Sequence, residues 1–221
     1  MCIRDSNNIA KEKGACEAFN RTKYSDGILP IDTYKKEVDE LVPNNLKYDW
    51  NSLRDDIKEH GLRHSTLSAQ MPSESSSVVS NATNGIEPPR DYLSVKKSKK
   101  GPLKQIVPQY NSLKNNYTLL WNMKDNSGYI KTTAVIQKFF DQAISGNWSY
   151  NPLNYPDNEV PMDVMAQDFL TTYKYGWKTS YYQNTYDAKS DVDVEETKVS
   201  LESLVSNIES ANESECESCT I

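Results

Sequence analysis

The amino-acid sequence predicts a mixed α/β fold followed by an acidic segment that has no core of its own. Apolar side chains recur every three or four residues, as on one face of a helix, in segments 50–60, 132–144 and 163–175. Short stretches rich in β-branched or aromatic residues stand between turn signals and favour strands at 92–95, 103–107 and 179–183. The segment 187–221 contains ten acids, two lysines and no aromatic residue. Such a segment cannot offset the entropy cost of ordering, so we expect a mobile acidic tail.

The length and composition indicate one ordinary domain plus this tail. A chain of 221 residues is too short for a multidomain enzyme. When the 14 tyrosines are left out of the apolar class and the 8 glycines are counted in it, apolar residues make up roughly 34% of the chain. The share in a typical soluble domain is about 45–50%. The mean hydropathy of -0.75 agrees. Either part of the chain is unfolded, or the folded part packs against apolar surface that lies outside these residues.

Charge, hydropathy and cysteine content exclude several classes of protein. The formal net charge is -6, and segment 187–221 contributes -8 of it, which leaves residues 1–186 at about +2 and predicts no general nucleic-acid partner. No apolar run approaches the roughly 20 residues that span a membrane. Four cysteines do not make a disulfide framework. A reducing, cytoplasmic compartment is expected.

The first half of the chain predicts helices separated by loops. Asp32 or Thr33 is a suitable N-cap for one of them, and Gly61 is a suitable stop for another. Gly14 ends the first, and Asn84-Gly85 ends the last. The predicted helices cover residues 7–16, 32–41, 50–60 and 78–83.

The second half predicts a hairpin and then alternating helices and strands. Strands 92–95 and 103–107 flank a turn with four lysines, which are best explained as a solvated hairpin tip rather than a phosphate site. We expect a helix or long turn at 113–123. In the two helices that follow, the expected core-facing side chains are Val135, Ile136, Phe139, Phe140 and Ala143, then Val164, Met165, Phe169 and Leu170.

Cys216 and Cys219 form a close pair that can switch between dithiol and disulfide. A zinc site is disfavoured, because zinc needs four ligands and the two histidines, His60 and His64, lie about 150 residues away. A thioredoxin-like site is also disfavoured, because such a pair begins a helix after a strand. Two interpretations stay open: delivery of electrons by a long arm, or incidental thiols.

Two other groups of residues have both a functional and a structural interpretation. The run Pro72–Ser77 offers hydroxyls and backbone N–H groups before an expected helix, which suits phosphate oxygens, but serine-rich segments are usually caps or loops. Tyr181 and Tyr182 are adjacent on an expected strand, which usually places one ring inward and one outward. A redox role for them requires a neighbouring oxidant.

Taken together, these segments resemble the large (alpha) subunit of ribonucleotide reductase, in its class Ia form. The resemblance runs from about residue 7 to residue 183 and includes the terminal cysteine pair. The matching motifs are Gly27-Ile28-Leu29-Pro30-Ile31-Asp32-Thr33-Tyr34, Trp50-x-x-Leu53, Gly61-Leu62-Arg63-His64-x-x-x-Ser68-Ala69-x-x-Pro72-Ser73-x-Ser75, Ser80-Asn81-Ala82-Thr83-Asn84-Gly85-Ile86-Glu87-Pro88-Pro89-Arg90 and Tyr181-Tyr182-Gln183-Asn184-Thr185.

The resemblance implies a role for seven residues. Glu74, Ser75 and Ser76 match the loop that holds the substrate diphosphate. Tyr181 and Tyr182 match the pair that relays a radical towards the active-site thiol. Cys216 and Cys219 match the shuttle that reduces the active-site disulfide, although family members differ in the spacing of this pair. Cys16 matches none of these roles and is expected to be buried and structural.

The resemblance also implies the fold and the partners. The fold is the C-terminal part of a ten-stranded α/β barrel over residues 7–186, with a flexible tail at 187–221. The partners are the small (beta) subunit with its metal-radical cofactor, thioredoxin or glutaredoxin, a ribonucleoside diphosphate and a second alpha chain. No cofactor is expected in this chain, and ATP or dNTP effectors are expected to bind upstream. The radical-forming cysteine is also expected upstream, so residues 1–221 alone should be inactive. The competing interpretation is a non-enzymatic redox or interaction module with an acidic C-x-x-C arm.

The first six residues have a separate interpretation. Met-Cys-Ile-Arg-Asp-Ser is the translation of the end of a common sequencing adaptor. On this interpretation Cys2 is an artefact, the natural chain continues upstream of Asn7, and the sequence is the C-terminal piece of a longer protein.

Overall fold

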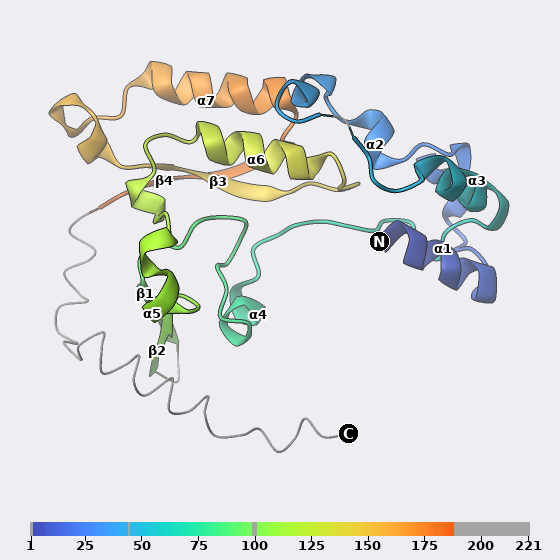
Figure 1. Cartoon of the computed structure of the whole chain (residues 1–221), viewed down its shortest axis with the longest axis horizontal. Helices are drawn as coiled ribbons and strands as arrows, with labels where there is room; N and C mark the ends of the chain where they lie inside the picture. The colour runs from blue at the N-terminus through green and yellow to red at the C-terminus, as the bar shows by residue number, and fades with distance from the viewer. Residues whose placement is uncertain (1, 44, 99–100, 188–221) are drawn as a thin grey trace. The chain divides into compact units, whose positions relative to one another are not determined.

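A computed structural model describes residues 2–43, 45–98 and 101–187 (Figure 1), and they form two compact units. The first unit contains the residues up to Pro72 together with Lys124–Asn184. The second contains Ser73–Met123 and the described residues from Thr185 onwards. The predicted cysteine pair at 216 and 219 lies outside the described residues.

The N-terminal part of the first unit is built on two packed helices, α1 (Cys2–Lys13) and α3 (Trp50–His60). The predicted bounds of α3 are confirmed. The Asp49 carboxylate caps it by accepting hydrogen bonds from the N–H groups of Asn51 (3.1 Å) and Ser52 (3.0 Å). The core around these helices consists of Ile3, Tyr24, Leu29, Ile31, Leu53, Ile57 and Leu62.

The helix predicted at 32–41 is wrong. The chain forms α2 (Pro30–Thr33) and then a separate 3-10 helix, Lys36–Glu40. The Asp32 carboxylate accepts a hydrogen bond from the Leu29 N–H at 2.8 Å, so it caps the N-terminus of a helix that has already begun at Pro30. Extended backbone at Tyr34 (ψ 162°) then separates the two helices.

The second part of this unit alternates helices and strands: α6 (Ser127–Gln137), β3 (Ser145–Tyr150), α7 (Met162–Tyr175) and β4 (Thr179–Thr185). β3 and β4 are hydrogen-bonded neighbours, and Gln70 adds a parallel bridge at Ile144. α6 packs against α7, and both run along one side of the strand pair (Figure 1). The predictions of a helix at 163–175 and a strand at 179–183 are confirmed to within two residues.

The helix predicted at 132–144 is wrong at both ends, because α6 begins at Ser127 and ends at Gln137, and β3 was not predicted. The Gln137 side chain ends the helix, because its oxygen accepts from the Ile144 N–H (2.9 Å) and its amide donates to the Gln142 carbonyl (2.8 Å). The chain therefore turns back and enters β3. Phe139, expected in the core, is 42% exposed and stacks on Trp50.

The expected core face of α7 is also wrong in part. Phe169 and Leu170 are each 58% exposed, whereas Asp168 is buried. The Asp168 carboxylate accepts hydrogen bonds from the Asn126 amide (2.9 Å) and the Tyr150 hydroxyl (3.0 Å). Burial raises the pKa of Asp168 against the effect of these two donors. A satisfied polar group, rather than the apolar stripe, thus faces the sheet.

The second unit contains α4 (Glu74–Val79) and the antiparallel hairpin of β1 (Leu93–Ser98) and β2 (Gly101–Ile106). The two predicted strands are confirmed. The helix predicted at 78–83 is wrong, because the serine run itself is helical. The segment predicted as a helix or long turn at 113–123 consists of separate short helices, which are α5 (Tyr110–Leu113) and the 3-10 helices Lys114–Asn116 and Leu120–Asn122.

Cys16 is a free thiol and is only half-buried, so its predicted burial is wrong. Cys2 is free and exposed. Within the described ranges, every helix is too short or too polar to cross a membrane.

Asp141 joins three distant segments of the first unit. Its carboxylate accepts hydrogen bonds from the N–H groups of Leu67 (2.8 Å) and Ser68 (2.9 Å) and from the Tyr24 hydroxyl (3.0 Å). Burial acts to raise the pKa of Asp141, but these donors outweigh it and lower the pKa. The stability that Asp141 contributes is therefore present above the unfolded pKa of about 3.9 and is lost as pH falls through the lower, folded value.

We expect Asp141→Asn to loosen this junction at neutral pH. The substitution removes the negative charge and leaves at least one buried N–H unsatisfied, which costs about 1–3 kcal/mol. Amide exchange at Leu67 and Ser68, followed by mass spectrometry, should accelerate by about tenfold or more. Asp56→Asn is the control, because Asp56 forms an exposed ion pair with Lys11 and should change little. Unaltered exchange in the Asp141 variant would contradict the assignment.

Candidate functional site

The serine run begins α4. Ser73 precedes the helix, and its N–H donates to the Asn84 carbonyl at 2.7 Å. The buried Ser77 hydroxyl donates to the Glu74 carbonyl at 3.0 Å. The side chains of Glu74, Ser75 and Ser76 are exposed, and their N–H groups lie in the first turn, where the helix itself offers no acceptor. This arrangement can present hydroxyls and N–H groups to an anion.

Side-chain amides tie α4 to the hairpin of the second unit. Asn81 follows α4 with φ 50° and donates to the Ile106 carbonyl at 3.0 Å. The Gln105 amide donates to the carbonyls of Ser77 and Val78, each at 3.4 Å. The serine run is therefore held on a folded support rather than on a free loop.

Next to this support is a hollow of about 700 Å³. Its lining comes from Ser80–Asn84, from Glu87–Asp91 and from both strands of the hairpin. Arg90 and Tyr117 contribute a charge and a ring to the lining. None of Glu74, Ser75 and Ser76 lines this hollow, so the structure does not bring the predicted substrate residues into it.

The tyrosine pair lies on β4, in the first unit. Tyr181 and Tyr182 are 54% and 60% exposed, and their ring centroids are 4.3 Å apart with an interplanar angle of 60°. The prediction of one inward and one outward ring is therefore wrong, because both rings are exposed and contact each other. The hydrogen bond from Tyr181 raises the pKa of Tyr182. Two phenols in contact, both open to the surface, can exchange a proton and an electron.

Residues that the sequence did not point to hold β4 in place beside β3. The buried Trp177 indole donates to the Ile144 carbonyl at 2.6 Å. A Cβ on Gly146 would lie 2.7 Å from the Trp177 ring, so only glycine lets the indole approach this closely. Further along, the Asn147 side chain accepts a hydrogen bond from the Tyr182 N–H at 3.2 Å. The only sequence signal for this arrangement is a glycine in a strand, which often marks a close approach.

The described residues contain no group of three or more histidine, cysteine, aspartate or glutamate side chains that could hold a metal ion. His64 is instead paired with the Ser6 hydroxyl at 3.0 Å, and His60 lies 3.6 Å from Glu59. Both histidines therefore have local structural partners.

The chain belongs to the α/β barrel class: a family model described as "Ribonucleotide reductase, barrel domain" matches residues 1–183. The chain is accordingly a member of the ribonucleotide reductase family, and the predicted family and barrel fold are confirmed. The interpretation of residues 1–6 as adaptor sequence stays a prediction, although Ile3 and Ser6 are buried in the structure.

Three named relatives show how much of such a protein the chain represents. It is 59% identical over 190 residues to ribonucleoside-diphosphate reductase subunit alpha of Haemophilus influenzae, covering 86% of this chain and 25% of that protein. It is 56% identical over 189 residues to ribonucleoside-diphosphate reductase 1 subunit alpha of Escherichia coli, with the same two coverages. It is 44% identical over 195 residues to the subunit alpha of Enterobacteria phage T4, covering 87% of this chain and 26% of that protein. The chain thus spans about a quarter of the length of these relatives.

Proposed function

We propose that the chain is part of the large subunit of an aerobic ribonucleoside-diphosphate reductase. The whole enzyme replaces the 2′-hydroxyl of a ribonucleoside diphosphate with hydrogen by radical chemistry, and paired thiols supply the two electrons. The observation that carries the proposal is the pair of exposed, contacting tyrosines on β4, within a chain of this family.

Tyr181 and Tyr182 relay a radical that starts on the small subunit, whose metal-radical cofactor is its source. A phenol that loses an electron and a proton together leaves no unpaired charge, which would be costly in a protein interior. The ring contact at 4.3 Å supports direct exchange between the two. Both rings are exposed, which supports a radical path that crosses this surface and continues on another chain or segment.

Cys216 and Cys219 reduce the active-site disulfide and are renewed by thioredoxin or glutaredoxin. Each transfer is a thiol–disulfide exchange, in which one thiolate attacks, a mixed disulfide forms and the second thiol resolves it. The chain itself needs no cofactor, while ATP and dNTP effectors bind upstream. We place the enzyme in the cytoplasm as an alpha homodimer, without a nucleic-acid or membrane partner.

Glu74, Ser75 and Ser76 hold the substrate diphosphate, mainly through hydroxyls and backbone N–H groups. In the full-length subunit, Ser75→Ala combined with Ser76→Ala should raise KM for the ribonucleoside diphosphate, because each hydrogen bond to a charged group is worth about 1.5–3 kcal/mol. The radical content of the small subunit should not change. Ser112→Ala is the matched control, since that exposed hydroxyl only donates to the Gln109 carbonyl. An unchanged KM in the double variant would show that the serine run only caps the helix and does not bind the diphosphate.

The proposal as a whole is tested by the full-length open reading frame and its product. A barrel with a radical-forming cysteine must precede these residues, and the purified subunit must form deoxynucleotide when the small subunit, thioredoxin and a ribonucleoside diphosphate are added. An upstream region without such a cysteine would instead favour a non-enzymatic redox module.

A further inference from the structure

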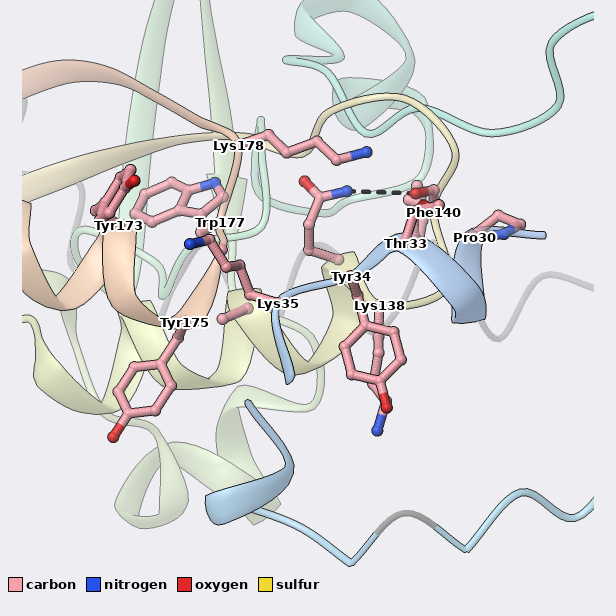
Figure 2. A pocket seen from close by; sticks show the side chains of 13 residues that line it. Pro30, Thr33, Tyr34, Lys35, Lys138, Phe140, Tyr173, Tyr175, Trp177 and Lys178 are labelled. Atoms are coloured by element: carbon pink, nitrogen blue, oxygen red, sulfur yellow. Dashed lines mark hydrogen bonds between the residues drawn. The ribbon is translucent and has the colours of Figure 1, made fainter. Parts of the chain in front are cut away.

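Two neighbouring hollows in the first unit share part of their wall, and their combined lining contains four lysines. Their volumes are about 280 Å³ and 350 Å³, and Pro30, Thr33 and Lys178 line both. Figure 2 shows the smaller one, which is formed by α2, the C-terminal ends of α6 and α7 and the loop 176–178 that precedes β4. The hollows lie within one unit and share no residue with the tyrosine pair.

The charges in this lining do not balance. The cations are Lys23, Lys35, Lys138 and Lys178, and Asp141 is the single acid. The Asp141 carboxylate is already occupied by hydrogen bonds from Leu67, Ser68, Gln142 and Tyr24. The lining therefore presents an excess of positive charge.

The lysines differ in how far this charge is neutralised. Lys138 is buried, points away beside Tyr34 (Figure 2) and is paired with Asp39 at 2.5 Å. Within the described part of the chain, neither Lys35 nor Lys178 forms an ion pair with a carboxylate. The Lys178 ammonium donates to the backbone carbonyls of Asp141 (3.0 Å) and Gln142 (3.4 Å).

Lys35 is placed by its neighbours on α7. Its ammonium lies 4.6 Å from the centre of the Tyr173 ring. Gly176 has φ 77°, and a Cβ there would lie 2.5 Å from the Lys35 Cγ, so glycine leaves room for the lysine stem. Figure 2 shows Lys35 and Lys178 on the rim of the same hollow, with the Lys35 ammonium towards Trp177 and Tyr173 and the Lys178 ammonium extending to the opposite side.

We propose that this hollow binds the phosphoryl group of a small ligand between Lys35 and Lys178. The lining offers lysines and no arginine. The arginine fork matches carboxylates and phosphates alike, whereas a lysine ammonium acts as a point charge that also commonly binds phosphate, so a hollow lined by lysines suits a phosphoryl group. The rings of Phe140, Tyr173 and Tyr175 supply an apolar wall for the rest of the ligand, as in most small-molecule sites.

The electrostatics of Lys178 support the proposal. Burial lowers the pKa of Lys178, Asp141 acts in the opposite direction, and Lys23 lowers it further. An anion beside the Lys178 ammonium would stabilise its charged form against both burial and the repulsion from Lys23.

The experiment uses the full-length subunit and follows lysine modification by formaldehyde and borohydride, residue by residue, with mass spectrometry. Inorganic phosphate and ribose 5-phosphate are the probes, and sodium chloride and acetate at equal ionic strength are the controls. The phosphate probes should slow modification of Lys35 and Lys178 by about tenfold, the effect of one charge-assisted hydrogen bond. Lys174, paired with Glu40 at 2.8 Å outside the lining, should react at an unchanged rate.

Variants complete the test. Lys35→Gln and Lys178→Gln should each weaken binding of the phosphate probe by about tenfold in calorimetry. Lys35 is exposed, so its variant stays informative even if Lys178→Gln disturbs the fold. Tighter binding of ribose 5-phosphate than of inorganic phosphate would assign a phosphorylated metabolite, and the reverse would assign the free ion. Absence of protection, equal protection by chloride or acetate, or unchanged affinity in Lys35→Gln would overturn the proposal.

Discussion

Replacing either Tyr181 or Tyr182 with phenylalanine should lower turnover by at least about 100-fold, or about 2.7 kcal/mol of transition-state free energy. Phenylalanine has no hydroxyl proton to lose, so it cannot hold the radical at a potential that the relay can use. The measurement is deoxynucleotide formation by the full-length variant with the small subunit and thioredoxin. The radical content of the small subunit should remain normal, because the block lies after it.

The structure separates this effect from a loss of stability. Both rings are more than half exposed, so the removal of one hydroxyl should cost no more than about 1 kcal/mol. Tyr48→Phe is the matched control, since Tyr48 is 61% exposed in the same unit and belongs to no site. Its turnover should equal that of the unmodified enzyme. Near-normal turnover in Tyr181→Phe or Tyr182→Phe would leave only a packing role for the pair.

The parts of the fold that could be predicted are those with local signals. α3 was predicted residue for residue, because its apolar spacing and the Gly61 stop lie within it or directly beside it. The hairpin of β1 and β2 was predicted for the same reason. β3 could not be predicted, because Ser145–Tyr150 contains glycine, asparagine and serine. Partners from elsewhere in the chain, namely Gln70, Trp177 and β4, make it a strand.

The orientation of α7 shows a second limit of prediction from the sequence. Its periodicity identifies an apolar stripe but does not say which surface covers that stripe. Asp168 faces the sheet because its two donors, Asn126 and Tyr150, lie 42 and 18 residues away along the chain and meet only in the folded state. The exposed Phe169 and Leu170 favour one of the two interpretations of the low apolar content, namely packing against surface outside these residues.

For the candidate site, the sequence predicted which residues take part but not how they are arranged. The family motif named Tyr181 and Tyr182, while alternation along a strand predicted opposite orientations for them. The observed contact requires the supports from Trp177 and Asn147, which no spacing reveals. The lysines of the proposed phosphoryl site come from segments far apart in the sequence, so their excess of charge appears only in the fold.

Cys216→Ser or Cys219→Ser in the full-length subunit should abolish repeated turnover with thioredoxin. Loss of either thiol prevents resolution of the mixed disulfide, so electrons no longer reach the active site from outside. One turnover from pre-reduced enzyme should survive, because the catalytic thiols already hold two electrons. Dithiothreitol should sustain activity, since a small dithiol needs no arm. Cys16→Ser is the control and should cycle normally, because that half-buried thiol matches no role in the shuttle.

The length of the sequence between the last strand and the cysteine pair is compatible with the proposed shuttle. About 30 residues separate Tyr186 from Cys216, and a flexible chain of that length has a root-mean-square span of about 30 Å. Fully extended it could reach about 100 Å, enough to visit both an interior disulfide and an external reductant. Tethering keeps the thiols near millimolar local concentration, so exchange within the protein exceeds exchange with dilute free thiols. Normal cycling of both serine variants with thioredoxin would show that the pair is incidental, whatever its reach.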